Sequence, residues 1–453
     1  MFPAAEQVLN PLFFSTRRVK FRTMKITVAG TGYVGLVTGV CLAEYGHEVT
    51  CVDVVADKIA MLNAGKSPIY EDGLDELLVK NRERLTFTTD CAAAYRDAEV
   101  IIIGVGTPEK KDGSANLTYL YAVVDEIAAT AERDCVVIIK STVPIGTNDK
   151  AEMRLRQQLK NNIKIDVVSN PEFLAQGTAV RDTLHPNRIV IGAENPAAAN
   201  KIREMYSGFN APVLVMNRRS AEMVKYASND FLALKISYIN EIANICEIVG
   251  ANIDDVASGM SYDARIGNRF LNAGIGYGGS CFPKDTKALH WLANFHDCEL
   301  KTVKAAIDVN ENQKLKLLKK SRKYFESFAG KKVAILGLTF KPGTDDLRDG
   351  PALTNVPILL DDGANIFAWD PVGAKNFRKV FPEGITYCDK IEDALKDADV
   401  CFIFTEWPEV KAFPPAGFRA LMKIPVVFDG RNCFPPAAMI AAGVEYSSIG
   451  RGA

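Results

Sequence analysis

The sequence predicts an α/β protein in which two doubly wound parallel sheets are joined by a long central helix and a helical region. Short apolar strands that end in glycine, acidic or hydroxyl residues recur in both halves of the chain. The run 221–249 contains neither proline nor glycine and lies between the halves. The strand pattern of 97–106 returns in 397–406, which indicates an internal repeat of one architecture.

Size and composition limit the function classes. With 453 residues, 48% apolar and 24% charged, the chain has room for two or three ordinary globular domains. Its formal net charge of −1 gives no reason to expect nucleic acid, and no apolar run approaches the ~20 residues of a membrane span. Ten cysteines without a CxxC pair and four histidines without metal-ligand spacing predict neither a disulfide framework nor a metal site. A reducing cytoplasm is the expected compartment.

The chain order suggests four segments. Residues 1–23 are basic but lack the serine-rich pattern of a transit peptide, so we expect a disordered extension before Met24. The predicted segments are this extension, a dinucleotide-binding domain over 24–217, a central helical domain over 218–320, and a second α/β domain over 321–453.

The first predicted strand, 25–29, runs into the GxGxxG motif of Gly30, Gly32 and Gly35. An apolar helix and a second strand follow, and that strand ends at Asp53, 23 residues after Gly30. Such glycines permit a tight turn and bring a pyrophosphate close to a helix N-terminus. An acid at this position binds the adenosine ribose hydroxyls and repels a 2′-phosphate, which favours NAD over NADP. Alternatively, the glycines serve only helix–strand packing.

Three later strands deliver polar residues to one edge of the sheet. The strands 100–105, 136–139 and 166–169 are followed by Thr107, Thr142 and Glu172, respectively. Loops after the carboxyl ends of parallel strands line the ligand crevice. We therefore expect these side chains to contact a cofactor or substrate, although turn threonines and a surface glutamate are the simpler alternatives.

The central helix carries Lys225 and Asn229, which are four residues apart and share one helix face. That face is either a solvated stripe or, because the helix is rich in packing residues, an inward face. The segment 254–271 then leads into a loop in which three glycines precede Cys281, followed by Lys284 and Asp285. A cysteine there is reachable by a bulky substrate, and a nearby ammonium favours its thiolate. A buried structural cysteine is the alternative.

The second sheet begins with the strand 332–338, but its turn lacks GxGxxG. The longer loop 339–348 carries Lys341 and Arg348 instead. Side-chain cations suit a diphosphate, so we expect a nucleotide-bearing substrate here. A degenerate copy kept for packing is the other interpretation.

A hydride acceptor next to a nucleophilic cysteine has a specific chemical logic. An alcohol is oxidised to an aldehyde, a thiolate adds to give a hemithioacetal, and a second oxidation leaves a thioester for water to cleave. Lys225 and Asn229 suit the developing alkoxides. Glu172 or Asp285 could position or deprotonate the water.

Three motifs carry a family resemblance: Asn170-Pro171-Glu172-Phe173-Leu174, Lys225-Tyr226-Ala227-Ser228-Asn229, and Gly276-Tyr277-Gly278-Gly279-Ser280-Cys281-Phe282-Pro283-Lys284-Asp285. They resemble the UDP-glucose/GDP-mannose dehydrogenase family, and the likeness runs from Met24 to about residue 445. The resemblance implies oxidation of UDP-glucose to UDP-glucuronate with two NAD. It also implies a homodimer, or a higher homo-oligomer, that pairs through the central helices.

The resemblance also implies roles for individual residues. Cys281 is the expected nucleophile, Lys225 and Asn229 the oxyanion donors, Glu172 the base for thioester hydrolysis, and Asp285 and Thr142 assistants through water. The expected NAD contacts are Gly30, Gly32, Tyr33, Val34, Gly35, Asp53, Lys58, Thr107, Thr142, Glu172, Lys284 and Arg348. The expected UDP-sugar contacts are Glu172, Phe173, Leu174, Lys225, Asn229, Arg265 from a neighbouring subunit, Asn268, Phe270, Gly278, Lys341 and Arg431. Asn272 departs from the pattern, because some members carry a lysine there.

Three other functions compete with this interpretation. A sibling enzyme would act on GDP-mannose or a UDP-N-acetylhexosamine. A two-electron dehydrogenase would use Lys225 and Asn229 and leave Cys281 as a bystander. A nucleotide-sugar sensor would bind both ligands without chemistry.

Overall fold

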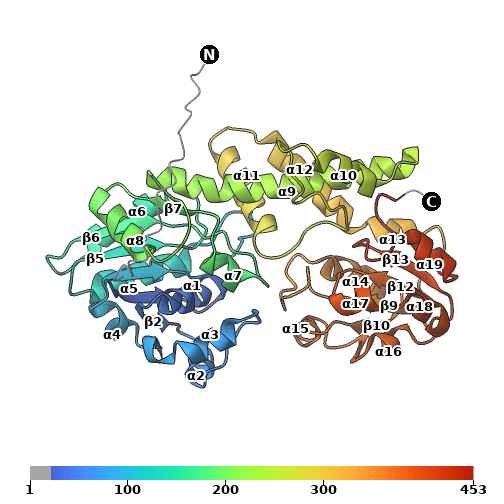
Figure 1. The fold of residues 1–453 in the computed structure, drawn as a ribbon, viewed down its shortest axis with the longest axis horizontal. Coiled ribbons are helices and arrows are strands. Elements are labelled where there is room, and N and C mark those ends of the chain that lie inside the picture. Colours follow the sequence, from blue (N-terminus) through green and yellow to red (C-terminus); the bar gives the residue numbers. More distant parts are fainter. Residues whose placement is uncertain (1–21, 452–453) are drawn as a thin grey trace, which may run out of the picture.

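The structure is a computed structural model that describes residues 22–451. Two α/β domains lie side by side, and the long helix α9 (Arg218–Val249) runs along one edge of both (Figure 1). Apart from Arg22 and Thr23, the extension expected over residues 1–23 lies outside the described residues. Arg22 pairs with Glu99 across 2.5 Å.

The first sheet has the strand order β3-β2-β1-β4-β5-β6-β7-β8. Its strands are β1 (Lys25–Ala29), β2 (Glu48–Val52), β3 (Leu85–Thr88), β4 (Val100–Ile103), β5 (Cys135–Ile139), β6 (Ile165–Ser169), β7 (Ile189–Gly192) and β8 (Val213–Met216). Its helices are α1 (Tyr33–Glu44), α2 (Ala56–Asn63), α3 (Leu74–Lys80), α4 (Cys91–Arg96), α5 (Thr118–Thr130), α6 (Thr147–Gln158), α7 (Ala179–Leu184) and α8 (Pro196–Met205), with a 3₁₀ turn at Arg82–Arg84. The strands β4 and β5 are apolar and buried throughout, as expected for parallel strands covered on both faces.

The predicted doubly wound α/β class is confirmed, with one difference at the end of the sheet. The strand β7 runs antiparallel to β6 and pairs with it only at Ser169 and Gly192, whereas β7 and β8 are parallel. The chain leaves the sheet after β6, forms the connection 170–188 that includes α7, and re-enters the sheet in the opposite direction. The strand predicted over 100–105 is also shorter, since β4 ends at Ile103.

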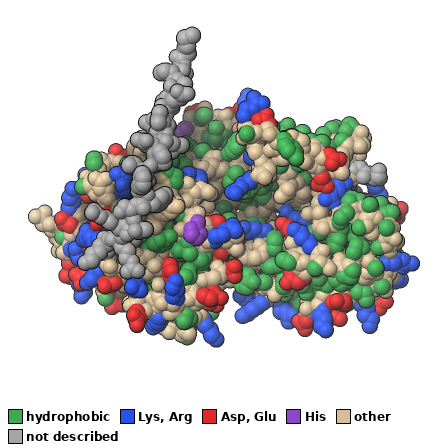
Figure 2. All heavy atoms as spheres, viewed as in Figure 1, with side chains coloured by type: hydrophobic (Ala, Val, Ile, Leu, Met, Phe, Trp, Pro, Cys, Tyr) green, Lys and Arg blue, Asp and Glu red, His purple; other side chains and the backbone are tan. Residues whose placement is uncertain are grey.

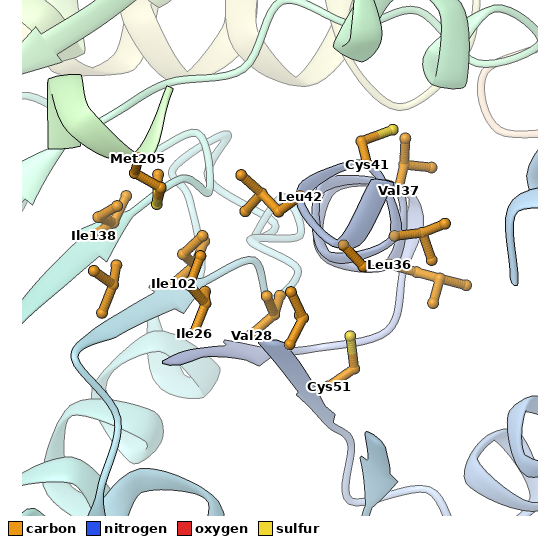
Figure 3. Close-up of a cluster of buried hydrophobic side chains, with 14 of the residues drawn as sticks. Ile26, Val28, Leu36, Val37, Cys41, Leu42, Cys51, Ile102, Ile138 and Met205 are labelled. Atoms are coloured by element: carbon orange, nitrogen blue, oxygen red, sulfur yellow. The ribbon is translucent and has the colours of Figure 1, made fainter. Parts of the chain in front are cut away.

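The first domain has a core on each face of its sheet, and the one between the sheet and α1 is shown in Figure 3 by Val28, Ile102 and Ile138 of the strands and Leu36 and Val37 of the helix. Glycines in α1 let it approach the sheet closely. A Cβ on Gly35 would lie 2.0 Å from the carbonyl oxygen of Gly30. Helix packing is therefore one genuine reason for the motif's third glycine.

The central helix confirms the long helix predicted over 221–249 and extends it by three residues at its start. Its N-cap Asn217 accepts a hydrogen bond from the Ser220 amide, and Gly250 ends it with φ 78°. The helices α10 (Ile253–Ser261), α11 (Phe282–Phe295), α12 (Lys301–Lys314) and α13 (Lys316–Ser321) follow. Within residues 22–451, no helix combines the length and apolar character needed to cross a bilayer.

The second sheet has the order β11-β10-β9-β12-β13-β14, which repeats that of the first six strands of the first sheet. Its strands are β9 (Lys332–Leu336), β10 (Asn365–Trp369), β11 (Ile385–Cys388), β12 (Val400–Ile403), β13 (Val426–Asp429) and β14 (Glu445–Ser447). Its helices are α14 (Pro351–Asp361), α15 (Ala374–Val380), α16 (Ile391–Leu395), α17 (Pro408–Ala412), α18 (Pro415–Leu421) and α19 (Pro436–Ala441). The repeat inferred from the sequence is thus a repeat of topology.

Substitution of the third and of the second glycine of the GxGxxG motif should affect stability differently. Gly35→Ala forces a clash with the Gly30 carbonyl, so we expect a loss of about 1–3 kcal/mol and a Tm lower by several degrees. Gly32→Ala is the matched control, because its Cβ meets no atom within 4 Å among the described residues. Thermal unfolding without ligands measures both; equal Tm values for the two variants would contradict the packing argument.

Candidate active site

A cavity of about 650 Å³ lies where the two α/β domains and the central helices meet. The loop after β6, the helix α9, the cysteine loop and the first loop of the second domain all line it. In the space-filling view, a notch separates the two domains, and basic side chains lie around it (Figure 2). The cavity brings together these residues singled out in the sequence: Glu172, Phe173, Leu174, Lys225, Asn229, Phe270, Gly278, Cys281 and Lys341.

Cys281 stands at the N-cap of α11, and it is partly exposed to this cavity. The glycines before it serve close packing of the loop against the second domain. A Cβ on Gly278 would lie 2.6 Å from the Asp349 carbonyl oxygen, and one on Gly279 would lie 2.7 Å from the Phe340 ring. The expectation that these glycines mainly leave room for a ligand is therefore incomplete.

The protonation of Cys281 depends on several charges. Burial raises the pKa of its thiol above the usual value, and the ammonium of Lys225 opposes this most strongly. Lys284, which the sequence suggested as the helping cation, has a smaller effect because its Nζ lies 2.5 Å from Asp285 Oδ1. The N-terminus of α11 adds a partial positive charge that favours the thiolate.

Lys225 and Glu172 form a buried ion pair, with 3.0 Å between Nζ and Oε1 and both side chains under a tenth exposed. Burial alone would lower the pKa of Lys225, but Glu172, Cys281 and Asp285 outweigh it and raise the pKa. The other carboxylate oxygen of Glu172 accepts a hydrogen bond from the Leu174 amide. Of the two alternatives for the face of α9 that carries Lys225 and Asn229, this burial supports the inward one, since the side chains are only 3% and 7% exposed.

Asn229 takes part in a second polar chain. Its amide nitrogen donates to Asp285 Oδ2 across 2.6 Å, and Lys284 holds the other oxygen of Asp285. Asp285 is 1% exposed. The carboxylate therefore orients the Asn229 amide, whose second N–H is left for a developing oxyanion.

The glycine turn and Asp53 form the nucleotide side of the first domain. Asp53 accepts hydrogen bonds from the amide and hydroxyl of Thr31, and Lys58 lies 3.4 Å away. Burial would raise the pKa of Asp53, but these hydrogen bonds lower it below the usual value. The space beside Gly32 and the start of the twelve-residue helix α1 fit a pyrophosphate, and Asp53 fits a ribose.

Other expected NAD contacts lie around this turn rather than in the cavity. Thr107 donates to the Thr142 carbonyl across 2.8 Å, so the ends of β4 and β5 are tied together. Tyr33 reaches the second domain, where its hydroxyl donates to Asp345. Arg348 pairs with Asp346 in that domain. Val34 follows Tyr33 in the first turn of α1 and is partly buried.

A second cavity, of about 530 Å³, adjoins the cysteine loop and contains Asn268, Asn272, Lys411 and Arg431. The guanidinium of Arg431 donates to backbone carbonyl oxygens of three segments, which fixes it against the loop. Arg265 lines neither cavity in the described part of the chain; its side chain is 89% exposed and pairs with Asp263.

Sequence reasoning missed several basic residues of the main cavity, among them Lys140 and Arg188. Lys140 donates to Asn170 Oδ1 across 3.1 Å, and burial lowers its pKa to about 8. Its place directly after β5 was the available signal. Arg188 stacks on Phe173 with 3.8 Å between guanidinium carbon and ring centroid, and no local pattern marks it. Across residues 22–451, no group of three or more His, Cys, Asp or Glu side chains is arranged to hold a metal ion.

Comparisons of the domains and of the whole chain with known proteins point to one family. The UDP-glucose/GDP-mannose dehydrogenase family matches in three parts: its NAD binding domain over 24–210, its central domain over 219–312 and its UDP binding domain over 334–436. UDP-glucose 6-dehydrogenase YwqF of Bacillus subtilis (strain 168) is 49% identical over 430 residues, covering 94% of this chain and 98% of that protein.

Two solved structures are similar over nearly their full length. A UDP-glucose dehydrogenase from Pyrobaculum islandicum has a TM-score of 0.89 and 34% identity, covering 97% of this chain and 100% of that one. A UDP-D-ManNAc dehydrogenase from Pyrococcus horikoshii has a TM-score of 0.84 and 28% identity, covering 94% and 99%. The two similar structures are therefore dehydrogenases of different UDP-sugars.

The geometry predicts that Lys225, more than any other cation, activates Cys281. We expect Lys225→Ala to slow alkylation of Cys281 by iodoacetamide several-fold at pH 7.5, because the thiolate loses its ammonium and gains an unpaired carboxylate nearby. Peptide mass spectrometry reports the rate, with exposed Cys298 as the internal reference. Lys287 lies on α11, the helix that begins after Cys281, and it pairs with Glu109. Lys287→Ala is therefore the control, and its Cys281 should be alkylated at the wild-type rate. Equal rates in both variants would refute this role.

Proposed function

This chain belongs to the UDP-glucose/GDP-mannose dehydrogenase family, and we propose that it oxidises UDP-glucose to UDP-glucuronate with two NAD, through intermediates bound to Cys281. The observation that carries the proposal is the meeting of Cys281, Lys225 and Glu172 in one cavity between two nucleotide-type domains. Full-length relatives named UDP-glucose 6-dehydrogenase support the substrate.

NAD is held by the glycine turn, by Asp53 at the ribose and by the threonines that follow β4 and β5. When bound, NAD accepts a hydride in each of the two oxidations. The remaining tasks belong to side chains of this chain: to hold the sugar, to move protons and to stabilise oxygen anions.

In the first oxidation, the C6 hydroxyl of the sugar gives up its proton and the C6 carbon gives up a hydride, which leaves an aldehyde. The Lys225 ammonium and the free N–H of Asn229 stabilise the developing alkoxide. Glu172 is the buried carboxylate that lines the cavity, and it is the available proton acceptor; Asp285, whose two oxygens are held by Asn229 and Lys284, acts through Asn229. Enclosure in the cavity keeps the aldehyde next to Cys281.

The thiolate of Cys281 then adds to the aldehyde carbon and forms a hemithioacetal whose oxygen meets the same two donors. Oxidation of this adduct leaves a thioester. Water bonds to the carbonyl carbon, the carbon–sulfur bond breaks, and the thiolate departs. Glu172 lines the cavity and accepts the proton of the water, whereas Asp285 and Thr142 do not line it and assist only through a further water molecule.

The nucleotide end of the substrate meets the second domain. Lys341 in the main cavity and Arg431 in the second provide the positive charge for a UDP group. A sibling activity on another sugar nucleotide stays a candidate, because one similar structure is a UDP-D-ManNAc dehydrogenase. A reducing cytoplasm is the compartment we propose for an enzyme with a free-thiol nucleophile.

A homodimer completes the proposed site. The outward face of α9 carries Tyr238, Ile245 and Ile248, which are 49%, 48% and 79% exposed and lie on one stripe. Exposed apolar stripes of this kind favour association. Arg265 extends away from its own cavities, and we assign it to the substrate of the partner subunit.

The reaction is tested by the NADH yield per substrate molecule. With limiting UDP-glucose and excess NAD, we expect two NADH per substrate and a UDP-glucuronate product; GDP-mannose and UDP-N-acetylhexosamines should react much more slowly. A yield of one NADH would favour the two-electron dehydrogenase, and preference for another sugar would refute the substrate. Cys281→Ser should abolish acid formation, because an alcohol without an adjacent base is a poor nucleophile.

The dimer is tested by two lysines on the outward face of α9. Ile245→Lys/Ile248→Lys should give a monomer in light scattering and lose most activity, because charges replace the apolar contact and Arg265 no longer reaches a neighbour. Met153→Lys replaces a residue of α6 that is 59% exposed and should change neither property. A double variant that stays dimeric would exclude this face as the interface.

A further inference from the structure

A buried carboxyl group with no part in the proposed chemistry lies one residue after Asn229. Asp230 is 5% exposed, and neither of its carboxyl oxygens has a hydrogen-bond partner among the described residues. One helical turn earlier, Tyr226 is 1% exposed, and its hydroxyl has no partner in residues 22–451 either. Buried polar groups in folded proteins are nearly always hydrogen-bonded, so this part of α9 is unusual.

The charges around Asp230 include one cation, and that cation is already engaged. The ionisable groups that face this region are Asp285 and Lys284 of α11, Tyr277 of the cysteine loop and Tyr226 of its own helix. Glu222 of α9 acts through Tyr226, and Glu311 of α12 acts through Tyr277. Lys284 Nζ lies 2.5 Å from Asp285 Oδ1. An ionised Asp230 would therefore be a buried charge next to a second carboxylate, with its nearest ammonium held by that carboxylate.

We propose that Asp230 is a positioning residue that keeps its proton at neutral pH, so that no second buried negative charge disturbs the hydrogen bond between Asn229 and Asp285. A neutral carboxyl group avoids the large cost of a buried unpaired charge. Burial first, and then the charge of Asp285, raises the pKa of Asp230 to about 8, while Lys284 opposes the rise. Asp230 itself touches no reacting atom in this assignment; it acts through Asn229 and Asp285.

The protonation of Asp230 has a consequence for the oxyanion donors. Loss of its proton adds a second negative charge to the surroundings of Asp285 and attracts Lys284 away from Asp285. Both changes oppose the negative charge that develops on the substrate oxygen. Turnover should therefore fall as Asp230 ionises, independently of the ionisation of Cys281.

Thermal unfolding of the full chain without ligands tests the protonation. In the unfolded chain, Asp230 ionises near the ordinary pKa of about 3.9, whereas in the folded protein it holds its proton up to about pH 8. The folded state therefore binds more protons in this range, and its stability falls as pH rises. Relative to wild type, Asp230→Asn should gain several degrees in Tm between pH 5 and pH 8 and then level off.

Two further variants make this arm decisive. Asp230→Leu also cannot titrate, so its Tm relative to wild type should rise over the same pH range. With two variants, a folding defect in one of them leaves the other to decide the result. Tyr226→Phe removes the other orphan group, and its Tm difference from wild type should stay constant with pH. A constant difference for both Asp230 variants would overturn the proposal.

The kinetic arm rests on the proposed function. The ratio of kcat for Asp230→Asn to that of wild type should be near one at pH 7 and rise several-fold by pH 9, with KM for UDP-glucose unchanged. Cys281 ionises in both proteins, so its effect cancels in the ratio. A flat ratio would overturn the positioning role. If the wild-type protein did not oxidise UDP-glucose, that result would refute the proposed function instead. The thermal unfolding experiment would still decide whether Asp230 holds its proton.

Discussion

The buried ion pair between Lys225 and Glu172 is the interaction on which the site depends. A buried pair is stable only when both partners are held in place, and removal of one typically costs about 3–5 kcal/mol. The pair ties the loop after β6 to α9, so the first sheet and the central helix are fixed relative to each other. Cys281 depends on the same pair, because the Lys225 ammonium that neutralises Glu172 also stabilises the thiolate of Cys281. The Lys225 ammonium therefore contributes both to the stability of the site and to the reactivity of Cys281.

The second α/β domain reaches the site because the cysteine loop packs tightly against it. Gly278 and Gly279 bring that loop within van der Waals distance of Phe340 and Asp349 of the second domain. Larger residues there would separate Cys281 from Lys341. Both sheets have the same strand order, so in each domain the loops after the carboxyl ends of the strands form a binding surface. The cysteine loop lies where these two surfaces meet.

The amino-acid sequence by itself determined the features that depend on local chemistry. The strands β1 and β2, the helix α9 and the repeat of strand order follow from apolar patterning and from the absence of helix breakers in 221–249. The placement of Lys225 and Asn229 on one face follows from helix geometry. The placement of Thr107, Thr142 and Glu172 after strand ends follows from the rule for parallel sheets.

Only the tertiary structure decided which of these groups meet. The partners Lys225 and Glu172 are 53 residues apart, and Asn229 and Asp285 are 56 apart, so no local pattern could pair them. For the same reason, sequence reasoning chose the adjacent Lys284 as the activating cation and overlooked Asp230. The pKa of a buried group depends on the side chains that burial places around it. Residue type and spacing therefore specify the chemical groups, whereas their charges are set by the packing of distant segments.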